Sequence, residues 1–224
     1  MDNRDDNMGQ YEVLTFVPNV IDYVRIVLLL VAYYQMPGDP VTGSLCYFSN
    51  VILDEVNGYA ARLFNQCTRF GSQLDILVDL VGTCGLLTVL CMLYPRWAMV
   101  FQVSTALDIS SHWMHFYSTI SLMKSATHKM ANFASPLLNL YYSNSHFMRV
   151  MCIGNQACYI MLYLRYFTPG PFWPFTRVGL YAVLFYLCLP VALLKTYINC
   201  VQLQEAVRTI TEVDMQERKQ ALAY

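Results

Sequence analysis

The sequence predicts an all-α fold: an integral membrane bundle of six transmembrane helices with a short amphipathic N-terminal helix. Of the 224 residues, 56% are hydrophobic and only 13% are charged, and the mean hydropathy is +0.37. A soluble domain has about a quarter of its residues charged, so this chain has too few charges to cover a soluble surface. Its apolar residues also gather in runs of about 20, the length that crosses a bilayer as a helix.

Six apolar runs follow one another, separated by breaks such as MPGDP at 36–40 and YPRW at 94–97. Each run is a predicted span, because a membrane-spanning helix needs about 20 mostly apolar residues. An amphipathic segment at 13–21 precedes them, and a mixed-charge tail at about 202–224 follows. We find no internal repeat, which favours a single domain over residues 1–224. The predicted spans are 20–36, 43–62, 74–94, 97–120, 147–167 and 178–200.

The basic residues support an even number of spans. Cytoplasmic loops of membrane proteins carry an excess of Lys and Arg. With six spans, eleven of the 14 Lys and Arg residues fall on one side, Arg25 and Lys195 among them. The other side receives Arg96, Arg165 and Arg177. The sequence therefore predicts cytosolic termini and cytosolic loops after the second and fourth spans.

Charge and cysteine content exclude several classes of function. The net charge is -1 and the pI is near 6.4, so the chain has no basic field to attract nucleic acid. The eight cysteines show neither CxxC pairs nor the Cys/His spacing of zinc sites. The N-terminal residues, MDNRDDNMGQYE, are polar and acidic, which argues against a cleaved signal peptide.

Acidic residues inside the apolar spans are the strongest functional signal. A carboxylate within a span is costly unless a cation or a water-filled cavity compensates it. Asp54 and Asn57 share one face of the second span, and Asp75 and Asp79 are one turn apart on the third. A short loop joins these spans, so we expect three carboxylates and one amide to converge near their cytosolic end. Such oxygen ligands suit Mg²⁺ or Mn²⁺.

Purely structural interpretations stay open for some of these polar residues. The acids of the second and third spans would then pair with Arg62 and Arg69 or form polar contacts between helices, although three acids outnumber the nearby cations. In the fourth span, we expect His112 and His115 to pack as polar residues near Asp108, because that span offers no third metal ligand.

The stretch at 54–79, DEVNGYAARLFNQCTRFGSQLDILVD, resembles the signature of the CDP-alcohol phosphotransferases. Seven of the eight signature positions match at the family spacing, and Asn57 stands where the family has its second Asp. Within the family, the chain most resembles the eukaryotic enzymes that transfer phosphatidyl groups to inositol. This likeness covers nearly the whole length, with motifs such as VPNVIDYVRI, LDISSHWMH and PVALLK. The chain departs from those enzymes at Asp22, where a glycine is expected, and at Leu80, where an arginine is expected.

The resemblance implies a metal-dependent transferase. Its substrates would be CDP-diacylglycerol and myo-inositol, and its products phosphatidylinositol and CMP. Two divalent cations, Mg²⁺ or Mn²⁺, would be bridged by Asp54 and Asp75, with Asn57 completing one metal site. Asp79 would serve the other metal and act as the catalytic base that takes a proton from inositol. The residues that the resemblance assigns to CDP-diacylglycerol are Gly58, Arg62 and Thr68.

The acceptor side of this reaction needs further basic groups. The candidates are Lys124, His128 and Lys129 between the fourth and fifth spans, and Arg149 at the start of the fifth. The alternative for each is an ordinary positive-inside anchor. The resemblance also implies an endoplasmic reticulum membrane as the location. It leaves the oligomeric state open, with a homodimer as one option.

Asn57 separates two hypotheses about function. An amide oxygen can ligate a hard cation, but the amide removes one negative charge from a site that must hold two dications. The first hypothesis is an active phosphatidyltransferase. The second is a weakened or inactive paralogue that keeps the fold and binds a lipid or a partner protein. The departures at Asp22 and Leu80 leave a different acceptor alcohol as a third option.

Overall fold

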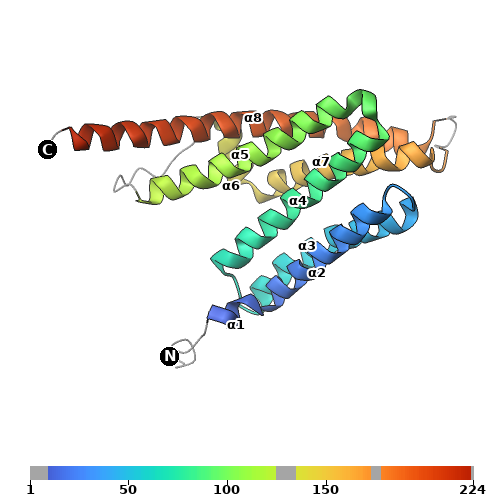
Figure 1. The fold of residues 1–224 in the computed structure, drawn as a ribbon, viewed down its shortest axis with the longest axis horizontal. Coiled ribbons are helices and arrows are strands. Elements are labelled where there is room, and N and C mark those ends of the chain that lie inside the picture. The colour runs from blue at the N-terminus through green and yellow to red at the C-terminus, as the bar shows by residue number, and fades with distance from the viewer. Residues whose placement is uncertain (1–9, 125–134, 173–177, 223–224) are drawn as a thin grey trace. The chain divides into compact units, whose positions relative to one another are not determined.

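The computed structural model describes residues 10–124, 135–172 and 178–222, and within these ranges the chain is helical (Figure 1). The one β feature there is an isolated bridge between Phe172 and Gly179. The chain divides into two compact units, Met1–Pro95 and Arg96–Tyr224. The elements are α1 (Gln10–Leu14), α2 (Val17–Gln35), α3 (Pro40–Leu63), α4 (Arg69–Leu93), the 3₁₀ turn η2 (Pro95–Trp97), α5 (Ala98–Lys124), α6 (Pro136–Ser143), α7 (Ser145–Phe167) and α8 (Leu180–Ala221).

Each of the six predicted spans lies on a helix apart from one or two residues at some of its ends. Four of these helices, α2, α4, α7 and α8, are long and apolar enough to cross a membrane. The other two helices, α3 and α5, are not among these four. Both carry acidic residues within the helix, Asp54 and Glu55 in α3 and Asp108 in α5. The structure therefore supports a multi-pass membrane protein, and the count of six spans stays a prediction.

The N-terminal amphipathic helix predicted at 13–21 is not confirmed as one element. α1 ends at Leu14, and α2 begins at Val17. Pro18 lies in the first turn of α2, where proline is favoured because the first helical N–H groups need no partner within the helix. The predicted segment therefore contains a helix boundary.

The C-terminal tail predicted at about 202–224 continues the last span without a break. α8 runs as one helix to Ala221. In its exposed part, Arg208 Nε lies 2.9 Å from Glu212 Oε1, one turn further along the helix. Pairs at this spacing stabilise a solvated helix slightly, so this contact is compatible with the continuation of α8 through the mixed-charge segment.

In the first unit, α2 and α3 form an antiparallel hairpin, and α4 packs against α2 (Figure 1). Asp39 caps the start of α3. Its carboxylate accepts hydrogen bonds from the Thr42 hydroxyl at 2.5 Å and from the backbone N–H groups of Val41 and Thr42 at 3.1 and 3.2 Å. These bonds, above all that of the Thr42 hydroxyl, hold the pKa of Asp39 below its usual value. The predicted break at 36–40 is thus a capped helical hairpin.

One face of α2 is buried along most of the helix. Its buried residues recur mainly at intervals of three or four, the spacing of a helix face packed in a bundle. The N-terminal half of this face is polar and charged, whereas the C-terminal half is apolar. The buried residues are Pro18, Asn19, Asp22, Arg25, Leu29 and Ala32. The polar half contributes to the candidate site described below.

In the second unit, α5 and α7 pack against α8. A hydrophobic core joins α6, α7 and α8 through Leu138, Tyr141, Met151 and Ile198. The sequence predicts only a loop between the fourth and fifth spans, so α6 is an additional element, and it is anchored by Leu138 and Tyr141.

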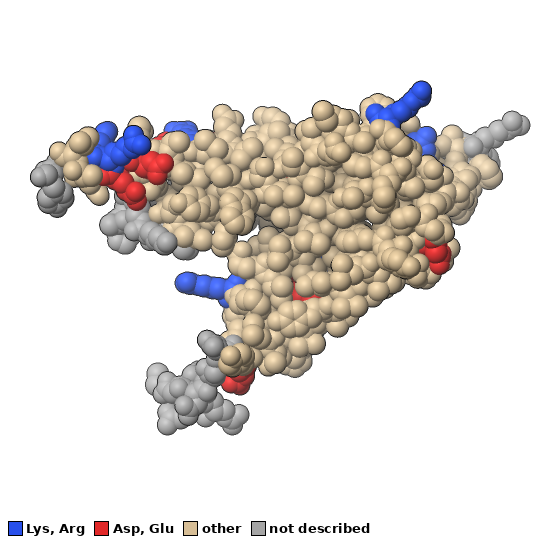
Figure 2. Space-filling model, in the orientation of Figure 1, with Lys and Arg blue, Asp and Glu red and all other residues tan. Residues whose placement is uncertain are grey.

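Large hydrophobic side chains cover much of the outer surface. Exposed examples are Val27 and Leu30 on α2 and Leu187 on α8. In Figure 2, the side chains of Lys, Arg, Asp and Glu gather mainly near helix ends, and the surface between them carries few charges. Extended exposed apolar surfaces of this kind mark contact with a membrane or a partner, in agreement with the apolar helices.

Gly85 on α4 allows a test of the packing against α2. A Cβ at this position would overlap the Tyr33 ring, and the Tyr33 hydroxyl donates a hydrogen bond to the Val81 carbonyl at 2.8 Å. We expect Gly85→Leu to destabilise the protein by at least about 2 kcal/mol through overpacking, measured by thermal unfolding in detergent. Thr88→Leu, at an exposed position of the same helix, should leave the midpoint unchanged. Equal midpoints for the two variants would contradict the contact.

Candidate metal centre

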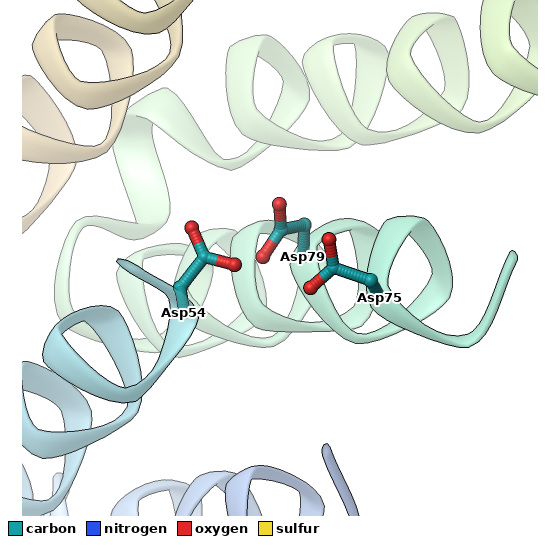
Figure 3. Close-up of side chains that lie close together, drawn as sticks. All are labelled: Asp54, Asp75 and Asp79. Carbon is teal, nitrogen blue, oxygen red and sulfur yellow. The ribbon is translucent and has the colours of Figure 1, made fainter. Parts of the chain in front are cut away.

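Three carboxylates converge in the first unit. Asp54 comes from α3, and Asp75 and Asp79 come from successive turns of α4 (Figure 3). One oxygen of each lies within 4.8 Å of the other two. All three side chains are partly exposed, so a ligand from outside the helices can reach them. The structure thus brings together the three acids that the sequence analysis singled out.

Arg25 of α2 lies in contact with all three acids, and sequence reasoning missed it. Its side chain is 0% exposed. Nη1 lies 3.0 Å from Asp54 and 2.5 Å from Asp75, and Nη2 lies 2.5 Å from Asp79. A further contact joins Nη1 to Asp22 at 2.9 Å. The positive-inside count places Arg25 on the cytosolic side of the membrane, and the structure shows that Arg25 is buried there among carboxylates that compensate its charge, so it is not evidence for that side.

Asp22 and Asn57 complete the cluster. Asn57 donates through Nδ2 to Asp22 Oδ1 at 2.9 Å and to Asp75 Oδ1 at 3.2 Å. Asp22 and Asn57 are 0% and 4% exposed. In the part of the chain that the structure describes, Asp22 Oδ2 and Asn57 Oδ1 are buried and have no hydrogen-bond partner. Buried polar atoms nearly always have partners, so these two oxygens are suited to bind a cation.

The cluster carries more negative charge than its own cation neutralises. Four carboxylates surround one guanidinium, which leaves a formal excess of three negative charges. Carboxylates this close destabilise one another unless further cations are present. Carboxylate and amide oxygens are the ligands that Mg²⁺ and Mn²⁺ prefer. The residues therefore fit the divalent metal that the sequence implies.

The residues expected to bind the nucleotide also lie in the first unit. Arg62 is exposed and extends over Gly58: a Cβ added to Gly58 would lie 3.6 Å from Arg62 Nη1. The Arg62 guanidinium is therefore available to phosphate oxygens. Thr68 caps α4, since its hydroxyl oxygen accepts a hydrogen bond from the Gly71 N–H at 3.0 Å. This gives Thr68 a structural role, and its contact with the nucleotide stays a prediction.

Two of the acceptor candidates lie on helices of the second unit. Arg149 is an exposed residue near the start of α7. Lys124 is the last residue of α5. His128 and Lys129 fall outside the described residues. A role in acceptor binding stays a prediction for all four.

A second polar network lies inside the second unit. Lys195 of α8 is buried, donates to Asn199 Oδ1 at 2.6 Å and lies 5.3 Å from the centre of the Tyr141 ring. Asn199 donates in turn to Asp108 of α5 at 2.9 Å. Asp108 also lies 3.4 Å from His112 Nδ1, which confirms the expected packing for His112, whereas the His115 ring stacks on Tyr142. Lys195 is therefore a buried residue of the bundle and not the cytosolic anchor that the charge count makes it.

Comparisons with known proteins agree with the family resemblance of the signature at 54–79. The family model described as CDP-alcohol phosphatidyltransferase matches residues 15–203. The chain belongs to this family. It is 39% identical to the CDP-diacylglycerol-inositol 3-phosphatidyltransferase of Rattus norvegicus over 94% of this chain and 98% of the rat protein. Proteins of the same name from Drosophila melanogaster and Schizosaccharomyces pombe are 39% and 34% identical, over 93% and 92% of this chain and 90% and 93% of theirs. No solved structure matches the chain.

The family match accounts for both units. It covers α2, α3 and α4 of the first unit and extends to residue 203 in α8 of the second. This extent is compatible with the single domain predicted over 1–224, which stays a prediction. In this CDP-alcohol phosphatidyltransferase, the signature acids Asp54, Asp75 and Asp79 are the ones that lie together.

The stability of the first unit should depend on Arg25. Arg25→Gln leaves the surrounding carboxylates without their cation, and removing one partner of a buried ion pair costs about 3–5 kcal/mol. We expect the free energy of unfolding of the purified protein, measured by chemical denaturation, to fall by this amount. Arg208→Gln, which breaks the exposed pair with Glu212, should cost at most about 1 kcal/mol. An Arg25→Gln variant as stable as the parent would show that the cluster does not need this charge.

Proposed function

We propose that this protein transfers the phosphatidyl group of CDP-diacylglycerol to myo-inositol, giving phosphatidylinositol and CMP. The observation that carries this proposal is the convergence of Asp54, Asp75 and Asp79 within the family signature. The printed names of the relatives give the substrates of those proteins. An identity of 39% over 94% of this chain supports the same substrates here.

The acids and the amide would hold the metals. Two divalent cations, Mg²⁺ or Mn²⁺, neutralise the pyrophosphate and polarise the attacked phosphorus when bound. Asp54 on α3 and Asp75 on α4 would be ligands of both cations, supplied from two helices. Asn57 would offer its unpartnered Oδ1 to one metal, and Asp79 would be a ligand of the other.

Three further residues would bind the lipid nucleotide. Arg62 offers a planar fork of N–H donors to phosphate oxygens. Gly58, without a side chain, lets the nucleotide approach the backbone of α3. Thr68, at the start of α4, would contact the nucleotide where the loop between the two helices ends. The acyl chains would stay in the bilayer beside the exposed apolar surface.

Asp79 is the proposed catalytic base. Arg25 holds its Oδ1 at 2.5 Å, which leaves the other oxygen to accept a proton. That oxygen takes the proton of the attacking inositol hydroxyl as the new P–O bond forms and the bond to CMP breaks. Arg25 is thus a positioning residue that fixes the orientation of the base. Lys124, Lys129 and Arg149 would bind the acceptor and its neighbouring phosphate.

A second candidate function is a weakened or inactive paralogue, and Asn57 is the observation that favours it. The deciding assay uses the purified protein with CDP-diacylglycerol, Mn²⁺ or Mg²⁺, and labelled inositol. CMP and labelled lipid in equal amounts support the transferase. Binding of CDP-diacylglycerol without product supports the paralogue. Product with serine or glycerol but not with inositol supports a different acceptor. The homodimer gains no support, and we do not propose one.

Carboxylate-to-amide variants test the roles of the acids. Asp75→Asn should reduce transferase activity at least about 100-fold, because the charge of a metal ligand is lost while the side-chain volume hardly changes. Asp79→Asn should be as inactive but bind Mn²⁺ better than Asp75→Asn, because its main role is proton transfer. CMP release and Mn²⁺ titration measure the two effects. Full activity of Asp75→Asn, or activity that survives EDTA, would contradict the metal mechanism.

We also propose an endoplasmic reticulum membrane as the location, with both termini and the metal centre on the cytosolic side. Removing the buried Arg25 and Lys195 from the count leaves nine of 12 Lys and Arg residues on that side. Single cysteines placed at each terminus of a cysteine-free variant should react with an impermeant reagent in sealed microsomes. Cysteines at Asp39, Arg96 and Arg177 should be protected. A protected terminus would contradict the orientation.

A further inference from the structure

We infer that Asp22 supplies the carboxylate that Asn57 lacks, so that this chain holds its divalent metal with an acid from α2 in place of one from α3. The inference rests on the proposed function and specifies the ligand set of its metal centre. It concerns two departures from the family pattern that lie in the cluster, Asp22 on α2 and Asn57 on α3.

The structure places these two departures in direct contact. Asn57 Nδ2 donates to Asp22 Oδ1 at 2.9 Å, although 35 residues separate them in the chain. Asn57 also reaches Asp75 at 3.2 Å. Asp22 therefore lies beside the one signature position that has lost its charge, and Asn57 links it to Asp75.

The contact makes the two departures chemically compatible with each other. The family pattern has Asp at 57 and glycine at 22, whereas this chain has Asn57 and Asp22. Carboxylates at both positions would repel each other at hydrogen-bond distance, whereas the Asn57 amide donates a hydrogen bond to Asp22. The exchange moves one carboxylate from α3 to α2, and it keeps the number of acids in the cluster at four.

The simpler role for Asp22 is that of a partner for Arg25, three residues further along α2. Arg25 already contacts Asp54, Asp75 and Asp79, so a fourth carboxylate is not needed to neutralise it. Burying one more charge at 0% exposure is costly unless a cation compensates it. The excess of negative charge points to a ligand with at least two positive charges.

Two unpartnered oxygens mark the position of such a ligand. Asp22 Oδ2 and Asn57 Oδ1 are both buried and without a hydrogen-bond partner among the described residues. Their side chains are joined through Oδ1 and Nδ2, so both unpartnered oxygens belong to one hydrogen-bonded pair. A carboxylate oxygen and an amide oxygen together can bind a hard divalent cation, and they leave the total charge of the site as it is in the family pattern.

The test exchanges the two functional groups. The full-length protein in detergent is titrated with Mn²⁺ without substrate, and free Mn²⁺ is followed by electron paramagnetic resonance. Asp22→Asn should weaken Mn²⁺ binding at least about tenfold. The double variant Asp22→Asn with Asn57→Asp, which has the same charge and nearly the same volume as the parent, should return within about threefold of it. Asp214→Asn removes an exposed acid of α8 and is the matched control.

Each contrary result overturns the inference. If Asp22→Asn lowers the thermal midpoint but leaves Mn²⁺ binding unchanged, Asp22 is only a partner of Arg25. If the double variant does not recover Mn²⁺ binding although it is folded, the two positions are not exchangeable. If the parent binds no Mn²⁺, or if Asn57→Asp alone tightens binding tenfold while Asp22→Asn has no effect, the amide at position 57 is uncompensated.

These titrations are independent of the transferase assay. Recovery of Mn²⁺ binding in the double variant would support the inference even if the parent formed no phosphatidylinositol, and then only the proposed function would fail. Transferase activity in the parent together with unchanged Mn²⁺ binding in Asp22→Asn would support the function and overturn the role of Asp22.

Discussion

The buried guanidinium of Arg25 is the interaction on which the first unit depends. It joins α2 to Asp54 of α3 and to Asp75 and Asp79 of α4, and its Nε donates to Asn50 of α3 at 3.3 Å. Without this cation, carboxylates from three helices would not pack at hydrogen-bond distance in an apolar bundle. The acids of the signature therefore owe their proximity to a residue outside the signature.

This dependence links stability to ligand binding. A single guanidinium brings the acids together but does not neutralise them, so the cluster keeps a formal excess of three negative charges. The remaining repulsion makes the cluster less stable by itself than with bound divalent cations. Any cation that binds the folded cluster better than the unfolded chain then stabilises the fold by mass action. In such an arrangement, a bound divalent cation would stabilise the packing of the helices as well as serve the proposed reaction.

The part of the site that lies on α3 and α4 could be predicted from the sequence, and the part on α2 could not. Asp54, Asp75 and Asp79 follow helical spacing on two helices joined by a short loop, so local geometry predicts that they face the same region. Arg25 is 29 residues from Asp54, and its burial follows from the packing of α2 against both other helices. The sequence did contain an indication of this burial. Asp22, Arg25 and Leu29 follow one another at intervals of three and four residues, which places them on one face of α2.

The same reasoning explains the two buried polar networks of this chain. In the second unit, the charge of Lys195 is matched by Asp108 through Asn199, so that network is neutral and holds α5 against α8 without needing a ligand. In the first unit, four acids share one arginine. Buried polar residues that balance one another serve to join helices, whereas an uncompensated charge of one sign inside a bundle is retained only where a ligand of the opposite sign completes it. Charge balance, more than the presence of acids, therefore distinguishes the candidate metal centre from the packing contacts of the membrane bundle.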